Sequence, residues 1–425
     1  MTILRNENSV VFLLGLILFS HFLHWPAVTN IAMMLLGILS IMALNMPKRL
    51  TSAIRTLGFW SMITFFLFYV LSLTYSQNME EGTRSVTAKL PLLVFPIMFS
   101  MLPVSSSLLK KFSRMFPLIL SAFFLICLGI QLQEVNATGD QSLIYSDNLG
   151  SVFHIQAVYG GLFVNLALIF ILFGIVDQKE NSKKDKVLYG ILAFFLFALH
   201  FLLISRLALI LGLLILAIFI FKLIWNTKKQ KWILPVALGM LLLPFLAYFS
   251  SEKLQNRFQS VFHTEFQYDN PNPINHFNAE QKEENWNSFT ARLATWTCAW
   301  EVFKKAPIVG QGVGDHFDEL MKEYEVKNYV LGLKEGYNTH NQYLDILLAC
   351  GILGLLALLL YFFYPLFIGF QSGNWLLAVL ALAFIFSALT ENILNRSQGI
   401  IVIAIVFSLY QSYNINQNKS VEQIK

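Results

Sequence analysis

Long apolar runs separated by short polar turns make up most of this chain, and one long polar segment interrupts them. A helix needs about 20 apolar residues to cross the hydrocarbon core of a bilayer. Lipid offers backbone groups no hydrogen-bond partners, so runs of this length are expected to form helices. Twelve runs are predicted to span a membrane, at about 8–24, 26–45, 57–75, 89–104, 112–132, 153–176, 187–204, 206–225, 232–250, 341–369, 374–390 and 396–413.

This pattern divides the chain into three parts. Residues 1–250 hold the first nine predicted spans, residues 251–340 form one large polar loop with an amphipathic helix, and residues 341–425 hold the last three spans and a tail. The run at 187–225 is about twice as long as one span requires, and Ser205-Arg206 interrupts it, so a hairpin is predicted there. No small-residue cleavage site follows the first run, which is therefore expected to remain as a span.

The composition agrees with a membrane protein. Hydrophobic residues make up 56% of the chain and charged residues 13%, and the mean hydropathy of +0.60 is too high for a soluble domain. We therefore predict an all-α, polytopic membrane protein. The cysteines Cys127, Cys298 and Cys350 show no disulfide or metal-site spacing and are expected to be buried.

The distribution of Lys and Arg predicts an orientation. If the N-terminus is cytoplasmic, most basic residues of the short loops lie on the cytoplasmic side, and the other side has only Arg84, Lys89, Arg206 and Arg396. Both termini are then cytoplasmic, and the large loop lies outside, which in a bacterial cell means the periplasm or the cell exterior. The net charge of +5 reflects this bias and does not indicate nucleic-acid binding.

Two arginines on the outer side are candidates for an anion site. Arg206 lies at the tip of the predicted hairpin, where it either snorkels to the interface or binds an anion. Residues Ser288 to Lys305 are predicted to form an amphipathic helix that ends before Pro307, with Arg292 and Trp296 on one stripe. A guanidinium binds phosphate oxygens in pairs, and tryptophan can stack on a sugar face or rest on the membrane surface.

A histidine motif opens the tenth predicted span, with the pattern His340-Asn341-x-Tyr343-x-Asp345. Histidine is the side chain best suited to accept a proton near neutral pH. The preceding Gly310-Gln311-Gly312-Val313-Gly314 lacks the surroundings of a nucleotide loop, so we expect a tight turn that returns the chain to the site.

Three further residues are secondary candidates: His154, Glu391 and Arg396. His154 could contact an acceptor sugar or could be an interfacial cap. Glu391, Asn392 and Arg396 surround the turn before the last span and could form a structural ion pair or take part in catalysis.

Several motifs follow one another in order across residues 155–360. They are Ser205-Arg206, Arg292-x-x-x-Trp296, Pro307-Ile308-Val309-Gly310-Gln311-Gly312-Val313-Gly314, His340-Asn341-x-Tyr343-Leu344 and Cys350-Gly351-Ile352-Leu353-Gly354-Leu355. Together they resemble the O-antigen ligase and polymerase superfamily of bacterial envelope glycan enzymes. The first five spans match only in hydropathy. The resemblance implies a GT-C-like inner-membrane glycosyltransferase, with its main periplasmic loop between spans nine and ten.

The resemblance also implies substrates and roles. In such enzymes the donor is an undecaprenyl-diphosphate-linked glycan, and an acceptor hydroxyl displaces the diphosphate with inversion. Arg206 and Arg292 would hold the diphosphate, and His340 would activate or orient the acceptor hydroxyl, with Trp296, Asn341 and Tyr343 as further substrate contacts. No cofactor or metal is expected, because fixed arginines can stabilise the leaving group and Asp315-x-x-Asp318 is a poor metal-ligand pair.

Three functions remain open from the sequence. A ligase would transfer the glycan to a lipid A core or another surface acceptor, and a polymerase would transfer it to a second lipid-linked repeat unit. A glycolipid transporter would place ionisable residues near the midplane or show internal repeats. Here they gather at one face, apart from His200 and Asp345, which favours an enzyme.

Overall fold

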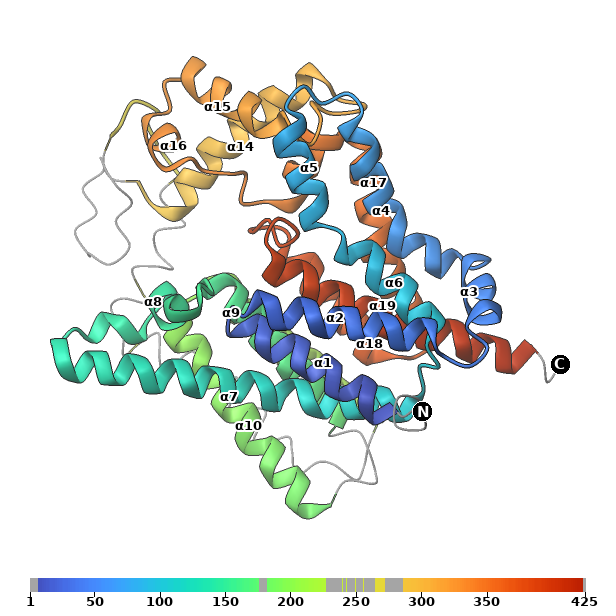
Figure 1. The fold of residues 1–425 in the computed structure, drawn as a ribbon. Coiled ribbons are helices and arrows are strands. Elements are labelled where there is room, and N and C mark those ends of the chain that lie inside the picture. The colour runs from blue at the N-terminus through green and yellow to red at the C-terminus, as the bar shows by residue number, and fades with distance from the viewer. Residues whose placement is uncertain are drawn as a thin grey trace.

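The computed structural model describes residues 7–175, 182–226, 264–271 and 286–422, together with positions 239, 242, 249 and 255. Every regular element within these residues is helical (Figure 1). Among the described residues, five helices are long and apolar enough to cross a membrane, or six if the bent pair Pro26–Ile41 and Met46–Ile54 forms one span. The prediction of an all-α membrane protein is therefore confirmed, while the count of twelve spans stays a prediction.

The helices of the described residues follow the predicted runs closely. Residues 232–250, the ninth predicted span, lie almost wholly outside the described residues. The bundle helices are α1 (Glu7–Phe22), α2 (Pro26–Ile41), α3 (Met46–Ile54), α4 (Leu57–Leu73), α5 (Met79–Ala88), α6 (Pro91–Met101), α7 (Ser106–Thr138), α8 (Asp147–Gly150), α9 (Ala157–Ile169), the π-helical η4 (Phe170–Ile175), α10 (Lys183–Leu203), α11 (Arg206–Asn226), α17 (Gln342–Gln371), α18 (Trp375–Ser387) and α19 (Ser397–Glu422).

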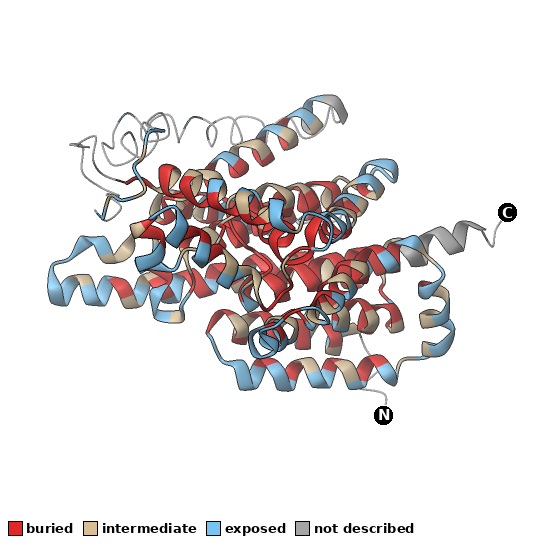
Figure 2. Cartoon of the chain, turned by 90° about the horizontal axis from the view of Figure 1, so that it is seen from above, coloured by how far each residue is buried: buried red, intermediate tan, exposed pale blue. Residues whose placement is uncertain are grey.

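The outer surface of the bundle is suited to lipid. On α2, the exposed side chains Ile31, Met34, Leu35, Ile38 and Ile41 follow helical spacing and form one apolar stripe. Figure 2 shows buried residues along the centre of the bundle and exposed residues on the helices that surround it. An apolar stripe of this length would be unfavourable in water, whereas hydrocarbon solvates it.

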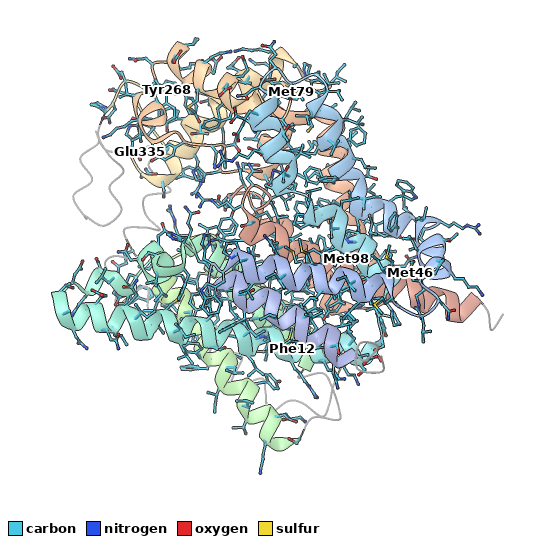
Figure 3. The ribbon with its side chains drawn as sticks, in the orientation of Figure 1. Phe12, Met46, Met79, Met98, Tyr268 and Glu335 are labelled. Carbon is cyan, nitrogen blue, oxygen red and sulfur yellow. The ribbon has the colours of Figure 1, made fainter. Side chains whose placement is uncertain are left out.

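Three shorter helices form a cap at one end of the bundle. These are α14 (Ser288–Lys305), α15 (His316–Val326) and α16 (Val330–Glu335), and α5 and α17 extend up to them (Figure 1). The cap has its own core, in which Trp286, Cys298, Tyr324 and Tyr329 pack together with Leu348 of α17. In Figure 3, Tyr268, Glu335 and Met79 lie at this end of the molecule and Phe12 lies in the helices below.

The helix predicted over residues Ser288 to Lys305 is present as α14. Asn287 begins it, because its side chain accepts hydrogen bonds from the backbone N–H groups of Phe289 and Thr290. The three cysteines are free and buried, as expected. Burial raises the pKa of the Cys298 thiol in α14 to about 12.

A glycine-rich segment, residues 307–314, connects α14 to α15 and packs against α17. Helix α17 breaks at Gly351, whose φ of 62° and ψ of −161° are not helical. Backbone N–H groups of Gln311 and Gly312 donate to the carbonyls of Leu348 and Ala349, and those of Ile352 and Leu353 donate to the carbonyls of Pro307 and Ile308. The sequence predicted only a tight turn here. The segment also supplies hydrogen-bond partners for the backbone groups of α17 at its break.

The same segment contacts the turn between α4 and α5. The Asp315 carboxylate accepts hydrogen bonds from the backbone N–H groups of Gln77, at 2.7 Å, and Asn78, at 2.8 Å. The Gly314 N–H donates to Ser76 Oγ at 3.0 Å, and the Tyr75 hydroxyl donates to the Val309 carbonyl. The cap is thus fixed to α17 by backbone hydrogen bonds, and to the α4–α5 turn by hydrogen bonds that each join a side chain and a backbone group.

We expect Gly351→Ala to destabilise the folded protein. A Cβ at this position would lie 2.3 Å from the Ile308 carbonyl oxygen, and the backbone region itself costs about 1–3 kcal/mol for residues other than glycine. Gly373→Ala is the matched control, because Gly373 has a φ of 67° but no atom within 4 Å of an added Cβ. Thermal unfolding in detergent should show a clearly larger loss for Gly351→Ala, and equal losses would contradict the proposed close approach.

Candidate functional site

His340 lies in a turn that is held from both sides. The buried Thr339 precedes it, and the Thr339 carbonyl accepts a hydrogen bond from Trp296 Nε1 at 2.8 Å. His340 has a left-handed φ of 42°, and its N–H donates to Asn338 Oδ1 at 2.9 Å. Asn341 then begins α17, accepting hydrogen bonds from the N–H groups of Tyr343 and Leu344. These contacts fix the backbone from which the imidazole projects.

The imidazole of His340 pairs with a buried carboxylate. Its Nδ1 lies 3.2 Å from Oε2 of Glu391, which comes from the turn between α18 and α19. The Glu391 side chain is 6% exposed, whereas that of His340 is 32% exposed. The carboxylate is therefore inside the protein, while the imidazole reaches the surface and can meet a substrate.

Charge stabilises the ionised form of Glu391. Burial alone would raise the pKa of its carboxyl, but the hydrogen bond with His340, the charge that His340 carries when protonated, and the charge of Arg292 outweigh burial and lower the pKa below its ordinary value. A carboxylate hydrogen-bonded at Nδ1 favours the tautomer with the proton on that nitrogen. The other ring nitrogen, Nε2, is then free to accept a proton.

Arg292 projects from α14 toward this pair. Burial lowers the pKa of its guanidinium, and the charge of Glu391 opposes that shift. Its Nε atom is buried and has no hydrogen-bond partner among the described residues. A buried arginine of this kind retains its charge and has donors for an anion.

Arg206 is linked to the same helix. As the first residue of α11 it donates from Nη2 to Ser288 Oγ at 2.6 Å, and Ser288 begins α14. Ser288, Arg292 and Trp296 are spaced four residues apart and so share one face of that helix. The structure thus brings Arg206, Arg292, Trp296 and His340 into one neighbourhood, as the sequence predicted for an outer-side cluster.

A buried polar network lies beneath the His340 turn and centres on Asp345. Asp345 Oδ1 and Oδ2 accept hydrogen bonds from the amides of Asn392, at 3.0 Å, and Asn395, at 2.9 Å. His316 Nε2 of α15 lies 3.8 Å from Oδ1, and Lys89 donates to Asn395 Oδ1 at 3.1 Å. Sequence reasoning did not anticipate the part that Lys89 and His316 play here, because their partner is distant in the chain.

The remaining predicted site residues have other contacts. Asn341 caps α17, and the Tyr343 hydroxyl donates to the Ile385 carbonyl at 2.9 Å, so both have structural roles in this arrangement. Glu391 pairs with His340, while Arg396 is exposed at the turn before α19. His154 is exposed, and its ring lies 5.1 Å from that of His24.

The acidic pair considered as a possible metal site has structural partners. Asp315 binds the backbone of the α4–α5 turn, and Asp318 accepts from the Asn78 amide at 3.4 Å. Across the described ranges, no group of three or more His, Cys, Asp or Glu residues could hold a metal ion.

A cavity of about 310 Å³ lies at the opposite end of the bundle, lined by Lys110, Lys222, Trp375 and Tyr413 among others. Helix α18 begins at this cavity and ends next to the turn that carries Glu391. The cavity is therefore separate from the cluster around His340.

Comparison with known families agrees with this arrangement. Residues 191–359 match the family model described as O-Antigen ligase. This region belongs to the O-antigen ligase and polymerase superfamily. The match confirms the resemblance drawn from the motifs, and it includes Arg206, Arg292, Trp296 and His340, while Glu391, Arg396 and His154 lie outside it. No curated protein matches the chain closely enough to count as a relative.

The lowered pKa of Glu391 predicts a pH-dependent contribution to stability. A carboxyl whose folded pKa is lowered stabilises the protein above its unfolded pKa of about 4.3 and loses this effect as pH falls through the folded value. Glu391→Gln should therefore unfold at a lower temperature than wild type near pH 7, and the difference should shrink below about pH 4. Thermal unfolding at several pH values tests this, with the exposed Glu335→Gln as control. A difference that stays constant with pH would contradict the pairing.

Proposed function

We propose that the protein is an O-antigen ligase-like glycosyltransferase. It would move a glycan from an undecaprenyl-diphosphate carrier to an acceptor hydroxyl on a lipid A core or another surface acceptor. The observation that carries this proposal is the position of Arg292, a buried cation with an unpartnered Nε, beside the His340–Glu391 pair. The family of residues 191–359 supports the same chemistry.

The proposed reaction needs a base and an anion site. Glu391 holds the proton of His340 on Nδ1, and Nε2 accepts the proton of the acceptor hydroxyl as its oxygen attacks the anomeric carbon. The bond between that carbon and the diphosphate oxygen breaks, and the diphosphate leaves on its lipid carrier. Attack from the side opposite the leaving group inverts the anomeric centre.

The arginines act on the leaving group. Negative charge grows on the diphosphate as its bond to the sugar breaks, and fixed cations stabilise that charge without having to reorganise. Arg292 is the direct contact in this proposal, and Arg206 binds the outer phosphate oxygens or holds α14 through Ser288. No metal ion is needed for this step.

The proposal includes an orientation in the cell. The chain would lie in the bacterial inner membrane with both termini in the cytoplasm, and the cap and His340 would face the periplasm. Residues 1–250 and 341–425 would form the membrane part and residues 251–340 the periplasmic loop. The bias of Lys and Arg toward one set of loops supports this orientation.

A polymerase uses the same donor chemistry and differs in its acceptor, which is a second lipid-linked repeat unit. We therefore distinguish ligase from polymerase by the intermediate that accumulates when the protein is lost. Full-length polymer left on the lipid carrier indicates a ligase, and single repeats left there indicate a polymerase.

Complementation of a deletion strain tests the proposed site. His340→Ala and Arg292→Ala should abolish surface glycan, because loss of a general base costs about 10²–10⁴-fold in rate and loss of a group that stabilises transition-state charge costs about 10²–10³-fold. Arg206→Ala should also reduce it strongly. Gel analysis of surface glycans and of lipid-linked intermediates provides the measurement.

Arg84→Ala is the matched control for the arginine variants. Arg84 is predicted to lie on the same side of the membrane, and its side chain is 82% exposed, with Glu81 as an ion-pair partner at 3.6 Å. This variant should restore wild-type glycan. If His340→Ala, Arg292→Ala and Arg206→Ala restored it equally well at normal protein levels, the site assignment would be wrong and a transporter would become the better explanation.

A further inference from the structure

The side-chain amide of Asn392 binds the backbone segment around His340. Asn392 Oδ1 accepts hydrogen bonds from the Asn341 N–H at 2.7 Å and from the Thr339 hydroxyl at 3.0 Å. Thr339 and Asn341 are the two neighbours of His340 in the chain. Asn392 is also next to Glu391, the carboxylate that pairs with the His340 imidazole. The contact to the His340 side chain and the contacts to its two neighbours therefore come from adjacent residues, Glu391 and Asn392.

Asp345 determines which way this amide points. Asn392 Nδ2 donates to Asp345 Oδ1 at 3.0 Å, so Oδ1 of Asn392 must face the opposite way, toward Thr339 and Asn341. An ionised carboxylate can only accept hydrogen bonds, whereas an amide at the same position can accept or donate. Asp345 thus opposes the flipped orientation of Asn392, in which the hydrogen bond from the Asn341 N–H would be lost.

The surroundings of Asp345 support a fixed, charged carboxylate. Its side chain is buried, at 4% exposure, and its second oxygen accepts from Asn395 Nδ2 at 2.9 Å. The buried Lys89 donates to the same Asn395, and the Lys89 ammonium lies 4.3 Å from the Tyr69 ring centre. His316 of the cap lies 3.8 Å from Asp345. His316 of α15 and the α18–α19 turn therefore meet at this carboxylate of α17, and Lys89 at the end of α5 reaches it through Asn395.

We propose that Asp345 is a positioning residue for the His340–Glu391 pair. It acts through Asn392, whose orientation it sets, and does not itself touch the substrate. Because this inference rests on the proposed function, the tests below separate the two. Mispositioning of a reacting group by about 1 Å can lower a rate about 10²-fold, which is the effect expected here.

The first variant is Asp345→Asn. It keeps the shape of the side chain, but the new amide can donate hydrogen bonds as well as accept them. The assay uses purified protein, lipid-linked glycan extracted from the deletion strain and lipid A core from the same strain, and measures release of undecaprenyl diphosphate. We expect kcat to fall about 10²-fold with KM for the donor unchanged. The pH profile of kcat should also shift, since the base is no longer held in one geometry.

A charge-balanced double variant separates positioning from simple charge compensation. Asp345→Asn leaves the buried Lys89 without its carboxylate neighbour, and Lys89→Met/Asp345→Asn removes both charges. If Asp345 only balances Lys89, the double variant should regain wild-type kcat, and the proposal would be overturned. If Asp345 orients Asn392, the double variant should fold well and keep the low kcat.

Two further variants complete the test. Asn392→Ala should lower kcat as Asp345→Asn does. If Asp345→Asn does not fold, Asn392→Ala provides the test by itself. A wild-type kcat in Asn392→Ala would refute the proposal. Asn395→Ala, which removes the amide on the other carboxylate oxygen, should change kcat only a few-fold. An inactive His340→Ala beside a fully active Asp345→Asn would remove this inference alone, whereas a fully active His340→Ala would remove the proposed function.

Discussion

The backbone pairing between residues 307–314 and the broken helix α17 is the constraint on which the rest of the structure depends. Helix α17 stops being helical at Gly351, and four N–H groups across the break bind carbonyls of the other segment. In a bilayer these groups have no other partners, so the two segments must stay together. The cap helices lie on both sides of residues 307–314 in the chain, α14 before them and α15 and α16 after them, so this pairing fixes the cap on α17.

This constraint explains how a site can form between distant parts of the chain. With the cap fixed, Trp296 of α14 donates to the carbonyl before His340, and Arg292 lies one turn earlier on the same face. The turn before α19 supplies Glu391 and Asn392 from the other side. Arg206 extends the arrangement to the α10–α11 hairpin through Ser288. Arg292, His340 and Glu391 are thus brought together by packing and hydrogen bonds between distant parts of the chain.

Much of the fold could be read from the sequence because local signals determined it. Helix α14 spans Ser288–Lys305 and ends before Pro307, and a break at Ser205 separates α10 from α11, as predicted. Contacts between distant residues carried no such signal. The pairing of His340 with Glu391, the meeting of Lys89 and His316 at Asp345, and the docking of the glycine-rich segment on α17 all depend on which helices become neighbours. The family resemblance implied that Asn341 and Tyr343 contact the substrate. In the structure, their side chains form hydrogen bonds within the protein itself.

The central claim is that the diphosphate of the lipid carrier binds between α14 and the His340 turn. A structure determined with undecaprenyl diphosphate bound would test it most directly. The account predicts phosphate oxygens within hydrogen-bond distance of the Arg292 guanidinium, with His340 Nε2 facing the same space. A diphosphate bound instead at the cavity lined by Lys110 and Lys222, at the other end of the bundle, would contradict it.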